Sequence, residues 1–210
     1  MEDLYIVGAG GFGRETAWVI RRINSINPVW NFIGFVDDNA SLYNSEIDGY
    51  KVIGPVTYLN SLSNAWAVCA IGNTAVRKEV IKKLENIRFA KLIDPSARIS
   101  DRVSIGEGSI IFAGSIITVD VNIGKHNIIN LNCKIGHDAV LSDFVTLYPS
   151  VNISGQVSIG TLTECGTGSQ IIQGLTIAQG VSIGAGAVVV KNIEDSGIYI
   201  GCPARKIKGK

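Results

Sequence analysis

The sequence predicts two consecutive parts: a small Rossmann-like α/β unit over residues 1–92 and a parallel β-helix over residues 93–210. Three observations predict this division. Strand-like and helix-like segments alternate before residue 93, and a glycine-rich loop follows the first predicted strand. From Ile93 to Val189 an aliphatic residue recurs at every sixth position without an insertion, interrupted in type only by Cys165.

The α/β unit contains four predicted strands and two predicted helices. We expect strands at residues 4–7, 31–36, 66–71 and 89–93, and helices at residues 14–24 and 75–84. Thr74 is placed to cap the second helix. Such alternation is typical of a small parallel sheet.

The glycine-rich loop and two following strand ends predict an anion-binding crevice. Residues 8–13 read GAGGFG, which matches GxGxxG between a strand and a helix. Asp37 and Asp38 end the second strand, near the place where a dinucleotide fold holds its ribose, and Gly72 follows the third. Exposed N–H groups and helix dipoles there favour a phosphate-bearing ligand. The alternative is that the glycines only permit tight packing. NAD is disfavoured because a second mononucleotide half is missing.

The six-residue repeat predicts a three-sided coil. A second inward position, usually small or apolar, follows four residues after each aliphatic one, from Ala97 to Ile193. Three repeats form a coil of eighteen residues, so residues eighteen apart lie in one column, about 4.8 Å apart. Seventeen repeats give between five and six coils. Glycine recurs at the fourth place, where a tight corner needs positive φ, at Gly108, Gly114, Gly168, Gly174, Gly180 and Gly186.

Composition excludes several classes of function. A net charge of +1 gives no bulk attraction to nucleic acid or to an acidic membrane. We find no signal peptide and no stretch of eighteen apolar residues, so we expect a cytoplasmic protein without membrane insertion. The four cysteines form no CxxC pair and are expected to be buried thiols, and no metal site is expected.

His137 is the more promising of only two histidines. It occupies the third place of its repeat, which points it outward at a corner, and Asp138 beside it could fix its tautomer. Gly155 lies eighteen residues on, so its N–H could stabilise an oxyanion in the same column. Asn130, at a neighbouring corner, could orient a substrate amine or hydroxyl. His126 has no comparable setting and is expected to be a solvated corner residue.

Six segments together resemble one enzyme family. The chain is similar, nearly from end to end, to bacterial hexapeptide-repeat acetyltransferases of the UDP-4-amino-sugar N-acetyltransferase type and to the related sialic-acid O-acetyltransferases. The segments are VGAGGFG at 7–13, GFVDD at 34–38, AIGN at 70–73, IGHD at 135–138, IGAGAVV at 183–189 and GCPA at 201–204. Such hexapeptide proteins coil left-handed, so the resemblance implies that hand here.

The resemblance also implies roles for individual residues. The catalytic base falls on His137, its acidic partner on Asp138 and the oxyanion amide on Gly155. The nucleotide-sugar diphosphate falls on Gly10, Gly11 and Phe12, with Asp37, Asp38 and Gly72 around the uracil or ribose. Contacts with acetyl-CoA, which lies between subunits of a homotrimer in this family, fall on Thr146, Thr167 and Ala185. The basic tail residues could face the coenzyme phosphates or simply be solvated: Arg205, Lys206 and Lys208.

The implied reaction is direct acetyl transfer from acetyl-CoA to the amine of a UDP- or dTDP-linked 4-amino-4,6-dideoxy sugar, without an acyl-enzyme. An outward apolar stripe around Ile110 and Ile128, with Phe112, Leu131 and Ile116 nearby, would suit a trimer interface, unless the N-terminal unit folds over it. Three alternatives remain at this point: O-acetylation of a sialic acid or related sugar, a non-catalytic nucleotide-sugar sensor, and a γ-class carbonic anhydrase, whose zinc would need three histidines.

Overall fold

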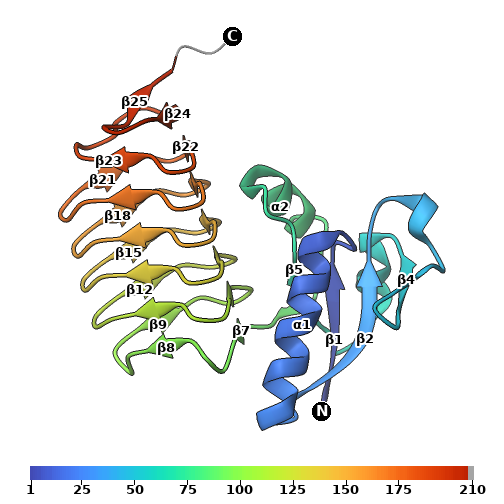
Figure 1. Cartoon of the computed structure of the whole chain (residues 1–210). Helices are drawn as coiled ribbons and strands as arrows, with labels where there is room; N and C mark the ends of the chain where they lie inside the picture. The colour runs from blue at the N-terminus through green and yellow to red at the C-terminus, as the bar shows by residue number, and fades with distance from the viewer. Residues whose placement is uncertain (208–210) are drawn as a thin grey trace. The chain divides into compact units, whose positions relative to one another are not determined.

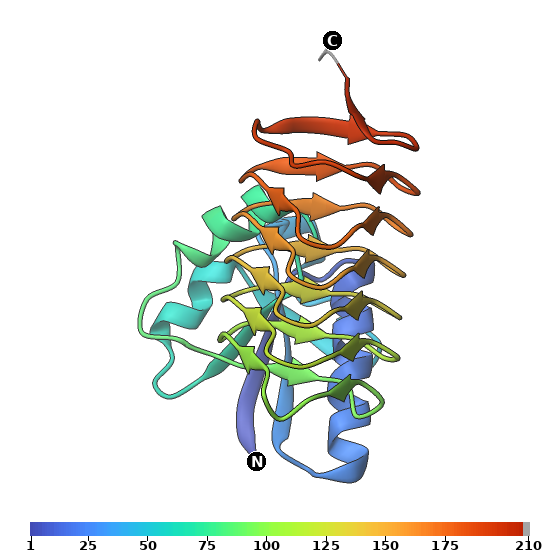
Figure 2. The ribbon, with the colours of Figure 1, turned by 90° about the vertical axis from the view of Figure 1, so that its left-hand side faces the viewer.

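The computed structural model describes residues 1–207, which form two compact units, Met1–Pro95 and a second unit that begins at Ser96. The first is an α/β unit and the second a parallel β-helix (Figures 1 and 2). The division falls three residues after the boundary that the sequence suggested.

The α/β unit is built on one twisted sheet with the strand order β3-β4-β2-β1-β5-β6. All neighbouring strands are parallel except β3 and β4. Helix α1 packs against β1 and β2. The bounds are β1 (Glu2–Val7), α1 (Gly11–Ile26), β2 (Trp30–Val36), the 3-10 turns η1 (Ala40–Leu42) and η2 (Val56–Ser61), β3 (Glu46–Ile47), β4 (Tyr50–Gly54), β5 (Trp66–Cys69), α2 (Thr74–Ile81) and β6 (Arg88–Phe89).

Two local features of this unit differ from the sequence-based expectation. The hairpin β3–β4 was not predicted; its two-residue loop, Asp48-Gly49, has φ of 51° and 82°, as a type I′ turn requires. The cap of α2 is Asn73, whose side chain accepts a hydrogen bond from the Val76 N–H at 2.9 Å. Thr74 is instead the first helical residue and is buried.

The β-helix has three faces, and from β8 to β23 each strand pairs with the strand eighteen residues away. The last parallel pairing, between β22 and β24, joins residues sixteen apart. The first face holds β10 (Ile110–Ile111), β13 (Ile128–Ile129), β16 (Thr146–Leu147), β19 (Glu164–Cys165), β22 (Val181–Ile183), β24 (Gly197–Ile200) and the antiparallel β25 (Arg205–Lys206). The second face holds β8 (Arg98–Ile99), β11 (Ile116–Ile117), β14 (Lys134–Ile135), β17 (Asn152–Ile153), β20 (Gln170–Ile171) and β23 (Val188–Val189). The third face holds β9 (Ser104–Ile105), β12 (Asn122–Ile123), β15 (Val140–Leu141), β18 (Ser158–Ile159) and β21 (Thr176–Ile177).

The chain turns a corner after every strand, and from Gly108 to Gly186 each corner uses one left-handed residue. We call the passage from the first to the second face the first corner, from the second to the third the second corner, and from the third to the first the third corner. Positive φ recurs at every sixth residue from Gly108 to Gly186. Glycine fills six of these places, as expected; the others are Asp120, His126, Asn132, Asp138, Phe144, Ser150, Gln156 and Leu162.

The inward positions form one continuous core, from Ile111 to Ile193. Some polar residues at inward corner places form hydrogen bonds to the backbone; for example, the Thr163 hydroxyl donates to the Ala178 carbonyl at 3.0 Å. The buried Ser169 hydroxyl, by contrast, has no hydrogen-bond partner among the described residues. In β7 (Leu92–Ile93) Ile93 is 36% exposed and Leu92 is buried, the reverse of the order in the later strands of the repeat.

The expected exposed stripe on the first face is wrong. Ile110, Ile128 and Phe112 are buried within the single chain and offer no apolar surface. Exposed aliphatic residues gather instead at the second corner and its flanking strands. They are Ile116, Val119, Val140, Ile172 and Val190.

We predict that Leu147→Ala lowers the free energy of unfolding by about 2–5 kcal/mol, because it opens a cavity in a fully buried column. Urea denaturation followed by circular dichroism would measure the loss. Lys134→Ala, at an exposed strand position of the neighbouring face, is the control and should leave the midpoint nearly unchanged. Equal midpoints for the two variants would contradict this account of the core.

Candidate functional site

The four glycines where β1 passes into α1 have two different structural roles. A Cβ on Gly13 would lie 2.2 Å from the Gly8 carbonyl oxygen, and Gly8 itself has φ of 103°, so this pair permits the close packing of helix on strand. By contrast, a Cβ on Gly10 would meet nothing within 4 Å, and one on Gly11 would meet only the Arg14 side chain at 3.8 Å. Packing therefore explains Gly8 and Gly13, whereas Gly10 and Gly11 leave backbone open to a ligand.

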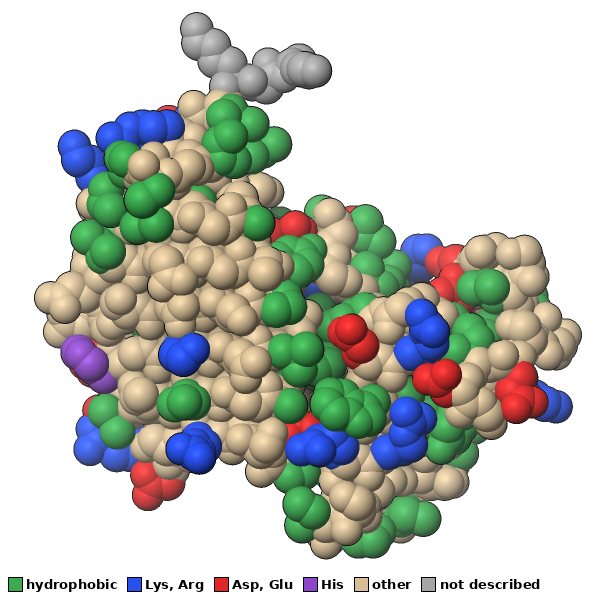
Figure 3. All heavy atoms as spheres, in the orientation of Figure 1, with side chains coloured by type: hydrophobic (Ala, Val, Ile, Leu, Met, Phe, Trp, Pro, Cys, Tyr) green, Lys and Arg blue, Asp and Glu red, His purple; other side chains and the backbone are tan. Residues whose placement is uncertain are grey.

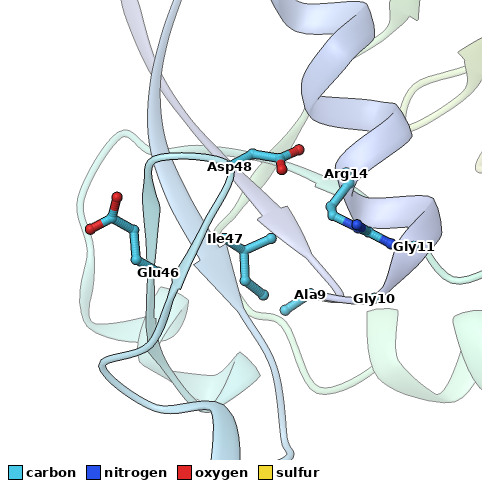
Figure 4. A pocket seen from close by; sticks show the side chains of 7 residues that line it. All are labelled: Ala9, Gly10, Gly11, Arg14, Glu46, Ile47 and Asp48. Atoms are coloured by element: carbon cyan, nitrogen blue, oxygen red, sulfur yellow. The ribbon is translucent and has the colours of Figure 1, made fainter.

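A cavity of about 410 Å³ opens at this end of α1 (Figure 4). Its helix side carries the first N–H groups of α1 and Arg14, whose side chain forms no ion pair among residues 1–207. Glu46 and Asp48 of the β3–β4 hairpin line the other side. Phe12 is half-buried in the first turn of α1. The cavity thus offers donors for an anion on one side and the Asp48 carboxylate for an amine or hydroxyl on the other, whereas the Glu46 carboxylate points away from the glycine-rich loop (Figure 4).

The two acids after β2 are held by backbone and side-chain donors. Asp37 accepts from the Ala9 N–H and the Asn39 N–H, both at 2.8 Å, and so ties the glycine-rich loop to the end of β2. Asp38 accepts from the Val56 N–H at 3.0 Å and from Lys83 Nζ at 2.7 Å. The Lys83 hydrogen bond, followed by that of Val56, lowers the pKa of Asp38.

Both acids also border a second cavity of about 290 Å³, which is mostly apolar. Its remaining lining residues are Val7, Gly8, Val56, Ile71, Val76, Val80 and Lys83. Ile71, rather than the expected Gly72, contributes to this wall. The buried Arg77 holds the loop in place by donating to the carbonyls of Ile71 at 2.6 Å and Gly72 at 2.9 Å.

His137 and Asp138 lie at the second corner of the β-helix and are both exposed. His137 Nδ1 lies 2.7 Å from Asp138 Oδ2. Because an ionised carboxylate only accepts, Nδ1 carries a proton in this contact, and in the neutral imidazole the lone pair is then on Nε2. Asp138 takes the left-handed corner conformation, with φ of 57°, and its N–H donates to the Val119 carbonyl at 3.1 Å.

Gly155 stands directly against the imidazole, one coil away. A Cβ at this position would lie 2.5 Å from His137 Nε2, so only glycine lets the ring rest there. The Gln156 N–H donates to the His137 carbonyl at 2.8 Å and locks the two coils together. Among the described residues the Gly155 N–H has no hydrogen-bond partner. A free base and a free amide donor therefore share one column.

The other expected site residues do not join this column within one chain. Asn130 lies at the first corner, is 7% exposed, and its Oδ1 accepts from the Leu131 N–H. Thr167 and Ala185 are exposed and stacked at the first corner, across the second face from His137. Thr146 is 1% exposed on the first face, so the structure gives it no surface for a coenzyme.

His126 is not the solvated corner residue that we expected. It is buried at the third corner and stacks on Phe144, with ring centroids 5.0 Å apart. The two histidines therefore belong to different corners. Within residues 1–207 no group of three or more His, Cys, Asp or Glu side chains is arranged to hold a metal ion.

Burial makes three of the four thiols poor nucleophiles. Desolvation raises the pKa of Cys69 to about 12 and that of Cys133 to about 11, and it also raises the pKa of Cys165. Only Cys202 is exposed. No helix in the described part of the chain is both long enough and apolar enough to cross a membrane.

The C-terminal end of the β-helix carries cations beside apolar side chains (Figure 3). Lys191, Arg205 and Lys206 line a cavity of about 280 Å³ there, together with Val190. Lys191 belongs to the column of His137, three coils away, which is about 14 Å at the spacing of β-strands. Lys208 lies outside the described residues.

Comparison with known proteins identifies the family of this chain. Residues 3–84 match the PglD N-terminal domain. The acetyltransferase domain of PglB from Neisseria gonorrhoeae is 30% identical with a TM-score of 0.90, and the match covers 99% of this chain and 100% of that one. The chain belongs to the hexapeptide-repeat N-acetyltransferase family. The left-handed β-helix is thereby confirmed.

Two further relatives bear on ligands in this family. A variant of perosamine N-acetyltransferase from Caulobacter crescentus, solved with CoA and GDP-perosamine, is 30% identical with a TM-score of 0.85, covering 100% of this chain and 98% of that one. UDP-N-acetylbacillosamine N-acetyltransferase from Bacillus subtilis is 36% identical over 119 residues, which are 54% of this chain and 52% of the relative. The matched region thus spans about half the length of that curated relative. The PglB domain has also been solved with acetyl coenzyme A.

Sequence reasoning missed the residues that complete the two cavities of the α/β unit. Arg14 was read only as a helix residue, and Lys83 and the β3–β4 hairpin were not singled out. The Asp48-Gly49 dipeptide was an available signal, since Asp-Gly between short strands favours a type I′ hairpin.

The two roles of these glycines predict two different effects of substitution by alanine. Gly13→Ala should lower the melting temperature of the protein, because its Cβ would overlap a backbone oxygen. Gly10→Ala should leave the melting temperature nearly unchanged but weaken binding of UDP or dTDP, because the methyl group covers the open backbone. Thermal unfolding and isothermal titration calorimetry would measure both. Unweakened nucleotide binding by a folded Gly10→Ala protein would favour a purely structural loop.

Proposed function

We propose that this protein transfers an acetyl group from acetyl-CoA to the amine of a nucleotide-linked amino sugar. The observation that carries the proposal is the column in which the lone pair of His137 Nε2 lies beside the unpartnered N–H of Gly155. A general base and an oxyanion donor are the two groups that acyl transfer to an amine requires. Membership of an N-acetyltransferase family supports the same reaction.

The nucleotide sugar is assigned to the α/β unit. Its diphosphate lies at Gly10, Gly11 and Phe12, where the open backbone, the start of α1 and Arg14 attract negative charge. Asp37 accepts hydrogen bonds from the ribose hydroxyls, because its oxygens keep spare lone pairs after accepting two N–H groups. The base occupies the cavity of about 290 Å³ beside Asp38, with Ile71 at its border; Gly72 follows Ile71 in the chain and is proposed only as a neighbour of this cavity.

A UDP- or dTDP-linked 4-amino-4,6-dideoxy sugar is the proposed acceptor. The name of the Bacillus subtilis relative contains a UDP sugar, and the Caulobacter crescentus relative was solved with a GDP sugar, so nucleotide sugars with an amino group suit this family. Asp48 lines the same cavity as the glycine-rich loop and supplies acceptors for sugar hydroxyl or amine groups.

The reaction proceeds without an acyl-enzyme. The sugar amine attacks the thioester carbonyl carbon while His137 Nε2 takes its proton, and the Gly155 N–H stabilises the negative oxygen that forms. Collapse of the tetrahedral intermediate breaks the C–S bond, and the proton on His137 passes to the leaving thiolate, so CoA leaves as its thiol. Asp138 holds the ring and balances the imidazolium charge at Nδ1. Asn130 lies at the first corner, away from His137 of the same chain. We therefore propose that it orients the substrate in the site of another subunit.

Acetyl-CoA is proposed to run along the second corner towards the C-terminal end. Ile172 and Val190 give this corner an apolar surface for the pantetheine arm, and Lys191, Arg205 and Lys206 offer positive charge to the phosphates. Thr167 and Ala185 lie at the first corner and not at the second. A single coenzyme therefore contacts residues of both corners only if one corner belongs to another copy of the chain. This requirement, and the exposed Val119 and Val140 beside His137, support a homotrimer with shared sites. Since both substrates are cytoplasmic metabolites, we place the activity in the cytoplasm.

O-acetylation of a sialic acid or related sugar is the second candidate, because a hydroxyl needs the same base and oxyanion donor. The names of the N-acetyltransferase relatives favour the amine. Neither a nucleotide-sugar sensor nor a γ-class carbonic anhydrase accounts for an imidazole held by a carboxylate against a free amide.

We predict that His137→Ala lowers kcat by about 10²–10⁴-fold, because general base catalysis is lost. Gly155→Ala should also lower kcat, because its Cβ displaces the ring from its place. Release of CoA thiol from acetyl-CoA, measured with UDP- and dTDP-4-amino sugars, would report both effects. Thr176→Ala, on the third face, is the control. An unaltered kcat in His137→Ala would remove the assignment, and full activity with a hydroxyl sugar alone would favour O-acetylation.

We predict that Val119→Glu dissociates the trimer and abolishes activity, because a carboxylate would be buried at the interface beside His137. Size-exclusion chromatography with light scattering would measure the mass. Asn122→Glu, exposed on the third face, is the matched control and should remain a trimer. A wild-type protein that is a stable monomer would rule out shared sites.

A further inference from the structure

A column of charged residues, which we call the ladder, occupies the second corner in the coils that precede and include that of His137. The proposed reaction gives no role to its first two members. Arg102, Asp120 and Asp138 are each eighteen residues apart and therefore occupy one column. The N–H of Asp138 donates to the carbonyl of Val119, so Asp138 lies directly over the peptide that precedes Asp120. Asp120 has the same left-handed conformation as Asp138, with φ of 57° in both.

Two acids stacked one coil apart repel each other, and Arg102 offsets this repulsion. Arg102 Nε donates to Asp120 Oδ1 at 2.8 Å, and its terminal nitrogen donates to Asp120 Oδ2, so the contact is bidentate. The hydrogen bond from Arg102 lowers the pKa of Asp120. In return the hydrogen bond and charge of Asp120 raise the pKa of Arg102, and the more distant charge of Asp138 acts in the same direction. Arg102 and Asp120 together leave the ladder below Asp138 close to neutral.

Few other charges face this part of the corner. On the second face the outward residues of the nearest strands are Lys134, which leans towards the Asn132 carbonyl at 3.5 Å, and Arg98. The third face contributes no charged residue, since its outward positions are Ser104, Asn122, Val140, Ser158 and Thr176. At the corner itself Asp101 lies two coils before His137, and the next two places after it are Gly155 and Gln173. Arg102 and Asp120 are therefore the closest charged pair of this column.

We propose that Arg102 and Asp120 are positioning residues of the acetyl transfer, which set the charge beside Asp138 and thereby the pH range over which His137 is a free base. This inference rests on the proposed function. Neither residue touches substrate; both act through Asp138. A balanced pair leaves Asp138 ionised to accept the hydrogen bond from the Nδ1–H group, whereas an unbalanced Asp120 carboxylate would add negative charge beside the imidazole.

The sign of each effect follows from Coulomb's law. Arg102→Gln leaves Asp120 uncompensated, which favours the imidazolium, so the acidic limb of the pH–kcat/KM profile moves to higher pH. Asp120→Asn leaves Arg102 uncompensated, which disfavours the imidazolium, so the same limb moves to lower pH. Asp120 lies one coil from Asp138 and Arg102 lies two, and all three are exposed, so each shift should be about half a pH unit or less, and added salt should shrink it.

The experiment compares pH profiles of CoA release for four full-length proteins: wild type, Arg102→Gln, Asp120→Asn and the double variant. We expect opposite shifts in the two single variants and a profile near wild type in the double variant. Thermal unfolding of each protein identifies any loss of fold, and Ser104→Ala provides a control at a neighbouring uncharged position. Asp120→Glu with Arg102 retained should restore the wild-type profile.

The outcomes separate this inference from the function beneath it. Shifts in the same direction, no shift in either folded single variant, or shifts that 0.5 M salt leaves unchanged would overturn the role of the pair. A wild-type protein that releases no CoA with any amino sugar, and whose His137→Ala variant behaves identically, would instead overturn the proposed function.

Discussion

The whole β-helix depends on one backbone constraint: a residue in the left-handed conformation once in every six. This conformation turns the chain at each corner, and the strict spacing brings every residue over the one eighteen positions earlier. Inward aliphatic side chains then stack in columns, and outward residues stack as well. Asp138 shows how the demands of structure and chemistry coincide. Aspartate tolerates positive φ better than most residues, and the same corner that requires this conformation holds its carboxylate against His137.

The sequence predicted the β-helix well because its geometry follows from counting. The pairing of His137 with Gly155 needed only the six-residue repeat and a coil of eighteen, and the structure places the ring against that glycine. The repeat says which side chains point inward, but it carries no information about what covers an outward side chain. Ile110 and Ile128 were therefore expected to be exposed and are buried, and His126 was expected in solvent and stacks on Phe144. Thr146, which was expected to contact the coenzyme, is likewise buried within the single chain.

The α/β unit was harder because its decisive contacts join distant segments. The spacing GxGxxG gives all its glycines equal weight, whereas the structure separates Gly13, which a carbonyl confines, from Gly10, which faces open space. Similarly, Lys83 reaches Asp38 across forty-five positions of the sequence, which no local pattern could reveal. Strand order, hairpin and cavity lining all belong to this class of long-range information. Only the existence of the sheet and the position of its loop were accessible from periodicity and turn residues.

The eighteen-residue period also limits how such a chain can change length during evolution. Removing the six residues of one repeat would rotate all later corners by one third of a turn. His137 would then lie over a residue of a different corner and no longer over Gly155. Removing a whole coil would preserve every alignment and merely shorten the column. Gains and losses within the β-helix are therefore tolerable mainly as complete turns. Related chains should differ in the number of turns while their reactive edge keeps its composition.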